Sequence, residues 1–325
     1  MPIENILLFV VSVIVLALAL IIDTLFGDPA NRFHPTAWMG KAINFLKSKF
    51  RSQNPKIEKL NGVFLAILVI LIFSIPAYFF LSFVWQYLGL LPYVIASAIL
   101  LKHTFAIRAM ENHVAPIANA IEHNNLEEAR RAVAYIVSRN PTSLNKNQVV
   151  SATVESIAES TVDGIVSPIF YFCFFGILGA ITYRVINTLD SMVGYRDKTH
   201  IHLGWFSAKL DSVANFIPAR SIAFLMMIAS ILLKEDWRNT WRILNRDRAK
   251  TSSWNAGYPM SAMAGALNIQ LEKPGSYILG DPNHDIETSH IYRALRITKL
   301  STFLFTASIA IPALFLTTIV MGVRL

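Results

Sequence analysis

The stretch ILLFVVSVIVLALALII at residues 6–22 is free of charge and almost entirely apolar. A helix of this length crosses a hydrocarbon core about 30 Å thick, so the stretch predicts a membrane-spanning helix. Among the side chains before it only Glu4 is charged, whereas a cleaved signal peptide begins with basic residues. We therefore expect this helix to remain in the protein as its first span.

Five further apolar segments follow, at residues 62–85, 88–101, 165–186, 216–233 and 300–323. The segment at 165–186 carries Gly176 and Gly179 near its centre, which would also suit a re-entrant pair of half-helices. The 325 residues are 54% hydrophobic and only 15% charged, outside the usual range of soluble domains. The sequence thus predicts an all-α, polytopic integral membrane protein with four to six membrane segments, forming one domain over residues 1–325.

Basic residues are unevenly distributed along the chain, whose net charge is +8. Most Lys and Arg lie in the connections 23–59, 102–163 and 234–299, and the positive-inside rule assigns all three to the cytoplasm. The side of the loop at 187–215 stays open. No basic stripe with interleaved aromatic residues points to nucleic acid. We expect a multi-pass protein of the cell membrane, with the lipid bilayer as a partner and no nucleic acid.

The connection 102–163 predicts two amphipathic helices. Asn125 can cap a helix over residues 126–138, with Glu128 placed to complete a capping box. Asn140 and the proline after it end this helix, and a second one begins at residue 144 or 145. The single cysteine, Cys173, lies in an apolar segment, so neither a disulfide framework nor a cysteine metal site is expected.

A first group of chemically capable residues directly follows the first span, in the run IIDTLFGDPANRFHP. It places Asp23, Asp28 and His34 close to the membrane surface. The turn Gly27-Asp28-Pro29 would hold the second carboxylate on a rigid loop. A plainer interpretation is also open, in which Asp28 caps a turn and His34 satisfies a backbone carbonyl.

A second group is the acidic stripe Glu155, Glu159 and Asp163, at i, i+4 and i+8 of one predicted helix. Carboxylates on one face repel each other unless cations lie against them, and oxygen-rich clusters suit Mg²⁺ bound together with substrate phosphates. The alternative is a solvated helix face, but such faces usually alternate in charge sign. The residues alone leave these two interpretations about equally supported.

A third group lies in the run YRVINTLDSMVGYRDKTHIHLGW, beside a predicted membrane segment. It contains Arg184, Asn187, Asp190, Tyr195 and Arg196, and ionisable groups at the edge of hydrocarbon tend to pair or to serve a site. Arg184 could equally extend to the interface. The chain has no P-loop, no dinucleotide-binding GxGxxG after a strand and no GxSxG elbow. Any use of ATP would therefore rely on carboxylates, asparagines and arginines that position Mg-ATP.

Five runs together resemble the signature segments of the CobD/CbiB family of cobalamin biosynthesis, in family order and over most of the chain. They are DTLFGDPANRFHPTAWMG (23–40), VESIAESTVDGIVSPIFY (154–171), YRVINTLDSMVGYR (183–196), GWFSAKLDSVANFIPAR (204–220) and NAGYPMSAMAGAL (255–267). The resemblance implies an adenosylcobinamide-phosphate synthase. Such an enzyme uses ATP to join (R)-1-amino-2-propanol, or its O-phosphate, to the free propionate of adenosylcobyric acid, through an acyl phosphate.

Residue type and match to the family's runs give the expected roles. Five carboxylates are expected to bind Mg²⁺: Asp23, Asp28, Glu155, Glu159 and Asp163. The residues expected to bind ATP or the acyl phosphate are Arg139, Arg184, Arg196 and Asn255. The residues expected to orient the substrate are Asn187, Asp190 and Tyr195, and His34 is expected to act as a proton acceptor. The chain departs from the family pattern at Asn140 and Ser160, which leaves room for a variant amine such as an ethanolamine derivative.

Two other classes compete with the ligase. A transporter would also place charges beside broken spans, but it predicts charges within spans rather than the long charged connection at 234–299. A non-catalytic membrane sensor or corrinoid carrier on the same scaffold would be expected to lose the acidic groups. Their retention favours the enzyme, with an active site facing the cytoplasm and other membrane-bound enzymes of the corrinoid pathway as candidate partners.

Overall fold

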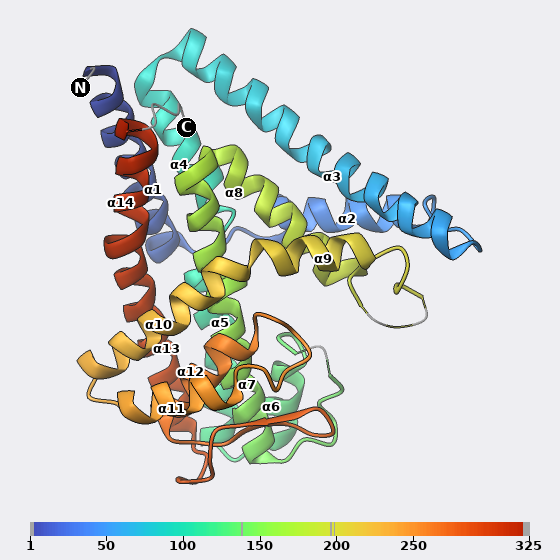
Figure 1. Ribbon diagram of the computed structural model, residues 1–325, viewed down its shortest axis with the longest axis vertical. Helices are drawn as coiled ribbons and strands as arrows, with labels where there is room; N and C mark the ends of the chain where they lie inside the picture. Colours follow the sequence, from blue (N-terminus) through green and yellow to red (C-terminus); the bar gives the residue numbers. More distant parts are fainter. Residues whose placement is uncertain (1–2, 138, 196, 198, 321–325) are drawn as a thin grey trace. The chain divides into compact units, whose positions relative to one another are not determined.

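Helices dominate the architecture, as the sequence predicts (Figure 1). The computed structural model describes residues 3–137, 139–195, 197 and 199–320. Within these residues five helical stretches are long and apolar enough to cross a membrane, and a sixth is possible if Trp205–Ala214 and Phe216–Leu232 count as one span. The five are Ile3–Phe26, Pro55–Leu88, Leu90–Glu122, Lys146–Val193 and Thr288–Ile319. The predicted class, a multi-pass helical membrane protein, is confirmed.

Two compact units divide the chain, and each is assembled from separate segments. Unit 1 comprises Met1–Ala106, Ser167–Ala214 and Ile309–Leu325, and unit 2 comprises Ile107–Val166 and Asn215–Ser308. The expected single domain over 1–325 stays a prediction.

Unit 1 is organised around helix α8. Its elements are α1 (Ile3–Phe26), a short 3₁₀ turn (Asn31–Phe33), α2 (Pro35–Lys47), α3 (Pro55–Phe83) with a π-helical turn after it (Val84–Leu88), α4 (Leu90–Lys102), α8 (Ser167–Val193), α9 (Trp205–Ala214) and α14 (Ile311–Phe315) with a second π-helical turn (Leu316–Val320). Helix α8 packs against α2, α3, α4, α9 and α14, while α1 packs against α4. The functional residues of unit 1 therefore lie around one central helix.

Helix α8 is broken at Gly176, whose backbone angles are φ 63° and ψ −158°. Residues with a side chain rarely adopt this conformation, so glycine is required here. The interruption falls where the sequence places the centre of its fourth apolar segment. The break agrees with the half-helix alternative that the two glycines left open, whereas a re-entrant path through the membrane stays a prediction.

Unit 2 surrounds the buried helix α12. Its elements are α5 (Ile107–Glu122), α6 (Leu126–Val133), α7 (Lys146–Thr161) with a π-helical turn after it (Val162–Val166), α10 (Phe216–Leu232), α11 (Trp237–Asp247), α12 (Gly257–Leu267), the antiparallel strands β1 (Leu271–Lys273) and β2 (Tyr277–Leu279), and α13 (Thr288–Phe305), which the π-helical turn Thr306–Ala310 extends. Helix α12 is in contact with α7, α10, α11 and α13. The fold of unit 2 thus buries the fifth signature run.

The start of α6 follows the predicted capping residue, and α7 starts one residue after the later of its two predicted first residues, 144 and 145. Asn125 caps α6 by accepting the N–H of Glu128, and its amide donates to the Glu128 carboxylate. Asn145 caps α7 in a capping box with Gln148. Helix α6 ends at Val133, earlier than the predicted 138. The β1–β2 hairpin was not predicted.

Candidate functional site

Four polar side chains of unit 1, which we term the Asp28 cluster, meet where α1 ends: Asp23, Asp28, His34 and Lys102. Asp23 lies in the last turn of α1 and is fully buried. Gly27 then takes a φ of 65°, a conformation that suits glycine at a helix end, so the chain turns sharply at Asp28. The turn brings both carboxylates to the same basic side chain.

That basic side chain is Lys102, the last residue of α4, which is only 1% exposed. Its ammonium group binds Asp28 and lies 3.7 Å from a carboxylate oxygen of Asp23. A buried charge is costly unless it is paired, so the lysine and the two carboxylates depend on one another. Lys102 was not predicted as a site residue, because it stands at the first position of a charged connection. A cation at the end of an apolar segment is the signal that could have identified it.

His34 orients the Asp28 carboxylate from the opposite end of the loop. As the N-cap of α2, its Nδ1 accepts the backbone N–H of Thr36 at 3.2 Å. The proton of the neutral ring is then on Nε2, which lies 3.5 Å from Asp28 Oδ2. Burial raises the pKa of Asp28, but the hydrogen bonds of His34 and Lys102 and the charge of Lys102 outweigh it and hold this pKa at about 2. The role of His34 as a proton acceptor stays a prediction.

A polar stripe on α8 lies next to the start of α2. Arg184 Nη1 donates to Asn187 Oδ1 at 3.4 Å, and its Nε lies 3.5 Å from the hydroxyl of Thr36, two residues after His34. Asn187 in turn donates to Asp211 of α9 at 3.4 Å. Unit 1 therefore brings together polar residues from the first, third and fourth signature runs. Asp211 was missed because a single aspartate in a short helix carries no distinctive pattern.

Two other residues expected to orient the substrate lie towards the end of α8. The carbonyl of Asp190 accepts the N–H of Gly194 at 2.7 Å as the helix ends. Tyr195 is about half exposed just beyond, and its ring contacts that of His200. Arg196, expected to bind phosphate, lies outside the described residues. Tyr195 therefore lies beyond the end of α8, whereas Asn187 lies on the helix itself.

In unit 2, Glu155 is the centre of a second group, which we term the Glu155 cluster: Arg139, Ser151, Glu155 and Tyr277. The carboxylate is 6% exposed. It accepts from Arg139 Nη2 at 3.2 Å, from the Ser151 hydroxyl at 2.8 Å and from the Tyr277 hydroxyl at 2.7 Å. Three donors satisfy most of the hydrogen-bonding capacity of one carboxylate, so Glu155 holds Arg139 in place rather than presenting an open oxygen.

The β1–β2 hairpin completes the Glu155 cluster. Ser151 accepts the N–H of Glu272 at 2.8 Å, and Arg139 Nη1 donates to the carbonyl of Glu272 at 3.2 Å. Burial raises the pKa of Tyr277, and the negative charges of Glu155 and Glu159 raise it further. Tyr277 therefore stays protonated and remains a hydrogen-bond donor. Sequence reasoning missed it because a tyrosine 122 residues away from Glu155 gives no local signal.

The remaining members of the acidic stripe are more accessible than Glu155. Glu159 is exposed one turn further along α7, and Asp163 is half-buried in the π-helical turn that follows. Among the described residues, no three His, Cys, Asp or Glu side chains converge in the manner of a metal site. Mg²⁺ commonly takes one or two protein carboxylates and completes its shell with water and phosphate oxygens. Glu159 and Asp163 are accessible enough to supply the one or two carboxylates that such a Mg²⁺ ion takes from the protein.

Asn255 joins the fourth and fifth signature runs in unit 2. Its side-chain oxygen accepts from Arg220 Nη1 at 3.2 Å. The guanidinium of Arg220 lies over the rings of Phe216 and Tyr258, at 3.5 Å and 4.3 Å from their centroids. A delocalised cation stacked on two aromatic rings is held in a fixed orientation. Arg220 was another residue that the sequence analysis did not select.

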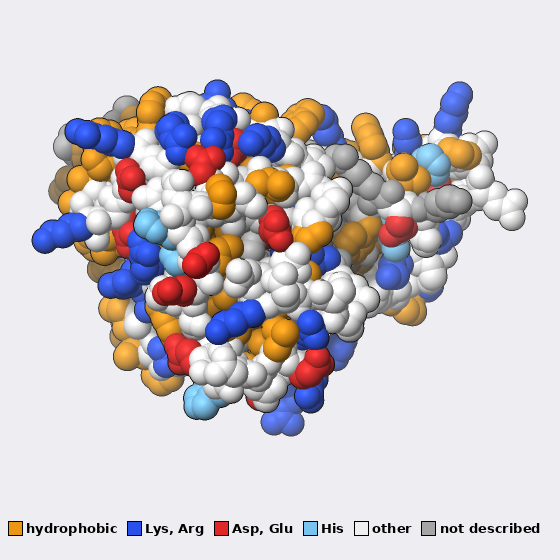
Figure 2. All heavy atoms as spheres, turned by 90° about the horizontal axis from the view of Figure 1, so that it is seen from below, with side chains coloured by type: hydrophobic (Ala, Val, Ile, Leu, Met, Phe, Trp, Pro, Cys, Tyr) orange, Lys and Arg blue, Asp and Glu red, His pale blue; other side chains and the backbone are white. Residues whose placement is uncertain are grey.

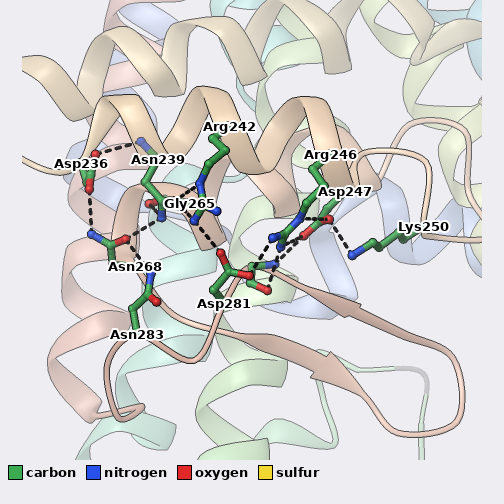
Figure 3. Close-up of polar contacts among 11 residues, drawn as sticks. Asp236, Asn239, Arg242, Arg246, Asp247, Lys250, Gly265, Asn268, Asp281 and Asn283 are labelled. Atoms are coloured by element: carbon green, nitrogen blue, oxygen red, sulfur yellow. Dashed lines mark hydrogen bonds and ion pairs between the residues drawn. The ribbon is translucent and has the colours of Figure 1, made fainter.

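A second Gly-Asp-Pro turn, beginning at Gly280, reproduces features of the first (Figure 3). Gly280 has a φ of 80°, and Asp281 accepts from Arg242 at 2.5 Å and from Arg246 at 2.7 Å. Arg246 also binds the fully buried Asp247. Burial raises the pKa of Asp247, but its bonds with Arg246, Lys250 and the Gly280 N–H hold it at about 2. Both turns thus present an aspartate that is fixed by two basic side chains.

The candidate spans define a multi-pass membrane protein, and each unit contains a cluster of paired polar side chains. The chain belongs to the CobD/CbiB family of cobalamin biosynthesis proteins, since the family model described as "CobD/Cbib protein" matches residues 16–298. The resemblance carried by the five runs is thereby confirmed.

Curated relatives cover nearly the whole chain. A "Probable cobalamin biosynthesis protein CobD" of Methanothermobacter thermautotrophicus is 40% identical over 92% of this chain and 97% of its own length. A "Cobalamin biosynthesis protein CobD" of Dehalococcoides mccartyi is 41% identical over 82% of this chain and 86% of its own. One of Leptospira interrogans is 35% identical, over 89% and 94%. No solved structure matches the chain.

Proposed function

We propose that this member of the family is an adenosylcobinamide-phosphate synthase. The free propionate of adenosylcobyric acid takes the terminal phosphoryl group of ATP, which gives an acyl phosphate and ADP. The amine of (R)-1-amino-2-propanol, or of its O-phosphate, then attacks the acyl carbon. The new C–N bond forms as the C–O bond to phosphate breaks, inorganic phosphate leaves, and the amine gives up one proton to a base.

The Asp28 cluster is the observation that carries this proposal. It lies in the first signature run, next to a candidate span, and it gathers two carboxylates, a lysine and a histidine in a largely buried setting. Arg184 is adjacent through Thr36. Phosphoryl transfer depends mainly on positioning and charge neutralisation, which are the two things that such a group of fixed charges provides.

Carboxylates of both units are assigned to nucleotide binding. When bound, Mg²⁺ would neutralise the charge of the phosphates. In unit 1, taken by itself, we propose Asp23 and Asp28 as protein ligands of Mg²⁺, and in unit 2, taken by itself, Glu159 and Asp163. Glu155 is reassigned from metal binding to positioning, because three donors already occupy its oxygens. Arg139 and Arg184 would then meet phosphate oxygens as charge-assisted donors.

Substrate orientation and membrane side complete the proposal. Asn187 is held between Arg184 and Asp211, so its amide is fixed for a polar substrate group. In unit 2, Asn255 is fixed by Arg220 and keeps its proposed assignment to the nucleotide. ATP is cytoplasmic, which agrees with the positive-inside assignment of the basic connections. We therefore place the reaction at the cytoplasmic face, where other membrane-bound enzymes of the pathway would be partners.

The test is a ligation assay with the full-length protein in lipid nanodiscs. Adenosylcobyric acid, Mg-ATP and either aminopropanol or its phosphate are supplied, and the corrinoid is followed by mass. We expect a mass gain of one amine, dependent on ATP. Asp28→Asn should reduce the rate at least ~100-fold, as removal of a preorganised electrostatic group does. Asp285→Asn, which neutralises an exposed aspartate of unit 2, is the matched control.

The outcomes separate the competing classes. Product with only one of the two amines identifies the acceptor. A folded protein that binds the corrinoid and forms no product with either amine, or with an ethanolamine derivative, would refute the ligase and indicate a sensor or carrier. An Asp28→Asn variant as active as wild type would remove the Asp28 cluster from the site.

A further inference from the structure

Helix α11 exposes two tryptophans among its arginines, although Ile243 and Leu244 are already packed inside. The face packed on α12 carries Asn239, Thr240 and Asp247, all buried, and Asn239 donates to the carbonyl of Gly265 at 2.9 Å. The outer face carries Trp237 and Trp241, which are 42% and 51% exposed. Figure 3 shows the polar side chains of α11 directed to Asn268 and Asp281. The outer face of a water-exposed helix is normally polar throughout, so these two tryptophans indicate a partly apolar neighbour.

The setting of α11 matches a membrane interface. It follows α10 after only four residues, and the end of α10 exposes Ile231 and Leu232 by 47% and 58%. Helix α10 forms part of the bent pair that qualifies as a candidate span. Tryptophan is enriched where hydrocarbon meets water, and helices with exposed tryptophan beside arginine lie in that plane. On the face seen in Figure 2, Lys and Arg side chains lie next to hydrophobic side chains.

A hollow of about 440 Å³ opens at the start of α11. Its acidic groups are already engaged, because Glu235 pairs with Arg293 and Asp236 accepts the backbone N–H of Asn239. Two other cations line the hollow, Lys234 and Arg238. Among the described residues neither has a carboxylate within 4.0 Å, although the charge of Arg238 acts on Asp236 and its guanidinium lies 5.5 Å from the centroid of the Trp237 ring. Lys234 also holds a left-handed backbone with a φ of 59°, which is uncommon for a residue with a side chain. The hollow is therefore suited to an anion.

We propose that α11 is an interfacial helix that binds an anionic phospholipid, with the lipid phosphate between Lys234 and Arg238 and the indoles of Trp237 and Trp241 at the level of the headgroups. Lys234 precedes α11 in the connecting turn and lines the same hollow as Trp237 and Arg238, while Trp241 lies one turn further along the exposed side of the helix, so one lipid surface can meet all four. This inference does not depend on the proposed reaction.

The first test measures how deep α11 lies in the bilayer, with a spin label on a single introduced cysteine. Its only cysteine, Cys173, is buried, so a Cys173→Ala background accepts one new label. A nitroxide at Trp241→Cys should collide more often with membrane-soluble oxygen than with a water-soluble nickel complex in nanodiscs. The matched label at Glu127→Cys, on the exposed face of α6, should show the opposite order. Equal water accessibility at both positions would overturn the interfacial helix and indicate a face covered by protein or solvent.

Headgroup recognition is the second test. Full-length protein in neutral detergent is titrated with short-chain phosphatidylglycerol and phosphatidylcholine. Phosphatidylglycerol should bind more tightly, and the double variant Lys234→Gln/Arg238→Gln should weaken it by up to about 30-fold, at about 5-fold per cation. The control Arg131→Gln/Lys146→Gln removes the same charge from exposed sites of unit 2 and should change little.

Two results would contradict headgroup binding. An equal loss in both double variants would mean that net charge alone attracts the lipid. Binding of glycerol 3-phosphate as tight as that of phosphatidylglycerol would assign the hollow to a soluble phosphate instead. Unfolding temperatures of both double variants within about 2 °C of wild type would show that neither result comes from misfolding.

Discussion

Replacement of Lys102 by methionine tests the strongest electrostatic dependence in the structure. Methionine keeps most of the length of the side chain, so the main change is loss of the charge that faces Asp23 and Asp28. Lys102 and Asp23 are buried almost completely. Removal of one partner from a buried ion pair costs about 3–5 kcal/mol, because the other charge is left without compensation. Two carboxylates would also then face each other, which raises the pKa of Asp28 from its value of about 2.

Thermal unfolding in detergent measures this cost. A loss of that size should lower the unfolding temperature by roughly 6–10 °C. Lys146→Met, which removes an exposed lysine, should lower it by no more than ~1 °C. Lys102→Met combined with Asp28→Asn should recover part of the loss, because both members of the pair are then neutral. If Lys102→Met unfolds like wild type, or if the double variant is as unstable as the sum of the single ones, the reasoning about this cluster is wrong.

Three further predictions concern pH, the hairpin and the break in α8. Asp28 has a pKa of about 2 in the folded protein and roughly 3.9 in the unfolded chain. Its ionised form therefore contributes about 2.5 kcal/mol to the free energy of unfolding above pH ~4, and this contribution is lost as the pH falls towards 2. Acid unfolding of the Asp28→Asn variant should lack this component. Tyr277→Phe removes a donor from the buried Glu155 and should cost about 1.5–3 kcal/mol in thermal unfolding, whereas Tyr135→Phe, at an 86% exposed position, should be neutral; equal effects would count against the cluster. Gly176→Ala should destabilise by about 1–3 kcal/mol, since alanine is strained at this backbone conformation, and an unchanged unfolding temperature would show that α8 can straighten.

The parts of the fold that could be predicted follow mainly from the hydrophobic runs and the helix-capping residues. As far as the described residues reach, each of the six apolar segments lies in helical structure, since a long apolar run leaves no alternative in lipid. The helix starts at Leu126 and Lys146 follow from the caps Asn125 and Asn145, which act locally. The end of α6 and the β1–β2 hairpin could not be foreseen. Strands of three residues show no usable alternation, and the hairpin is fixed by contacts to α7 far away in the chain.

The site was foreseen as a set of residues but not as a set of contacts. Asp28 and His34 were selected from their run, yet Lys102, which holds the two carboxylates together, comes from another helix. Glu155 was assigned to a metal because the pattern shows its neighbours on α7 only. Its actual partners, Arg139 and Tyr277, are brought to it by tertiary packing. Sequence patterns indicate which groups are chemically capable, whereas partners from distant elements decide what each group does.

The break at Gly176 has a mechanical consequence. An uninterrupted helix is stiff, so a displacement or rotation of one end is carried to the other end. A glycine with a φ of 63° acts as a joint, because the hydrogen bonds that stiffen the helix are interrupted there. The half of α8 that carries Arg184 and Asn187 can therefore tilt without carrying the half that begins at Ser167 along with it. Motion of the polar half is then limited by its packing on α2 and α9 rather than by the stiffness of α8 itself.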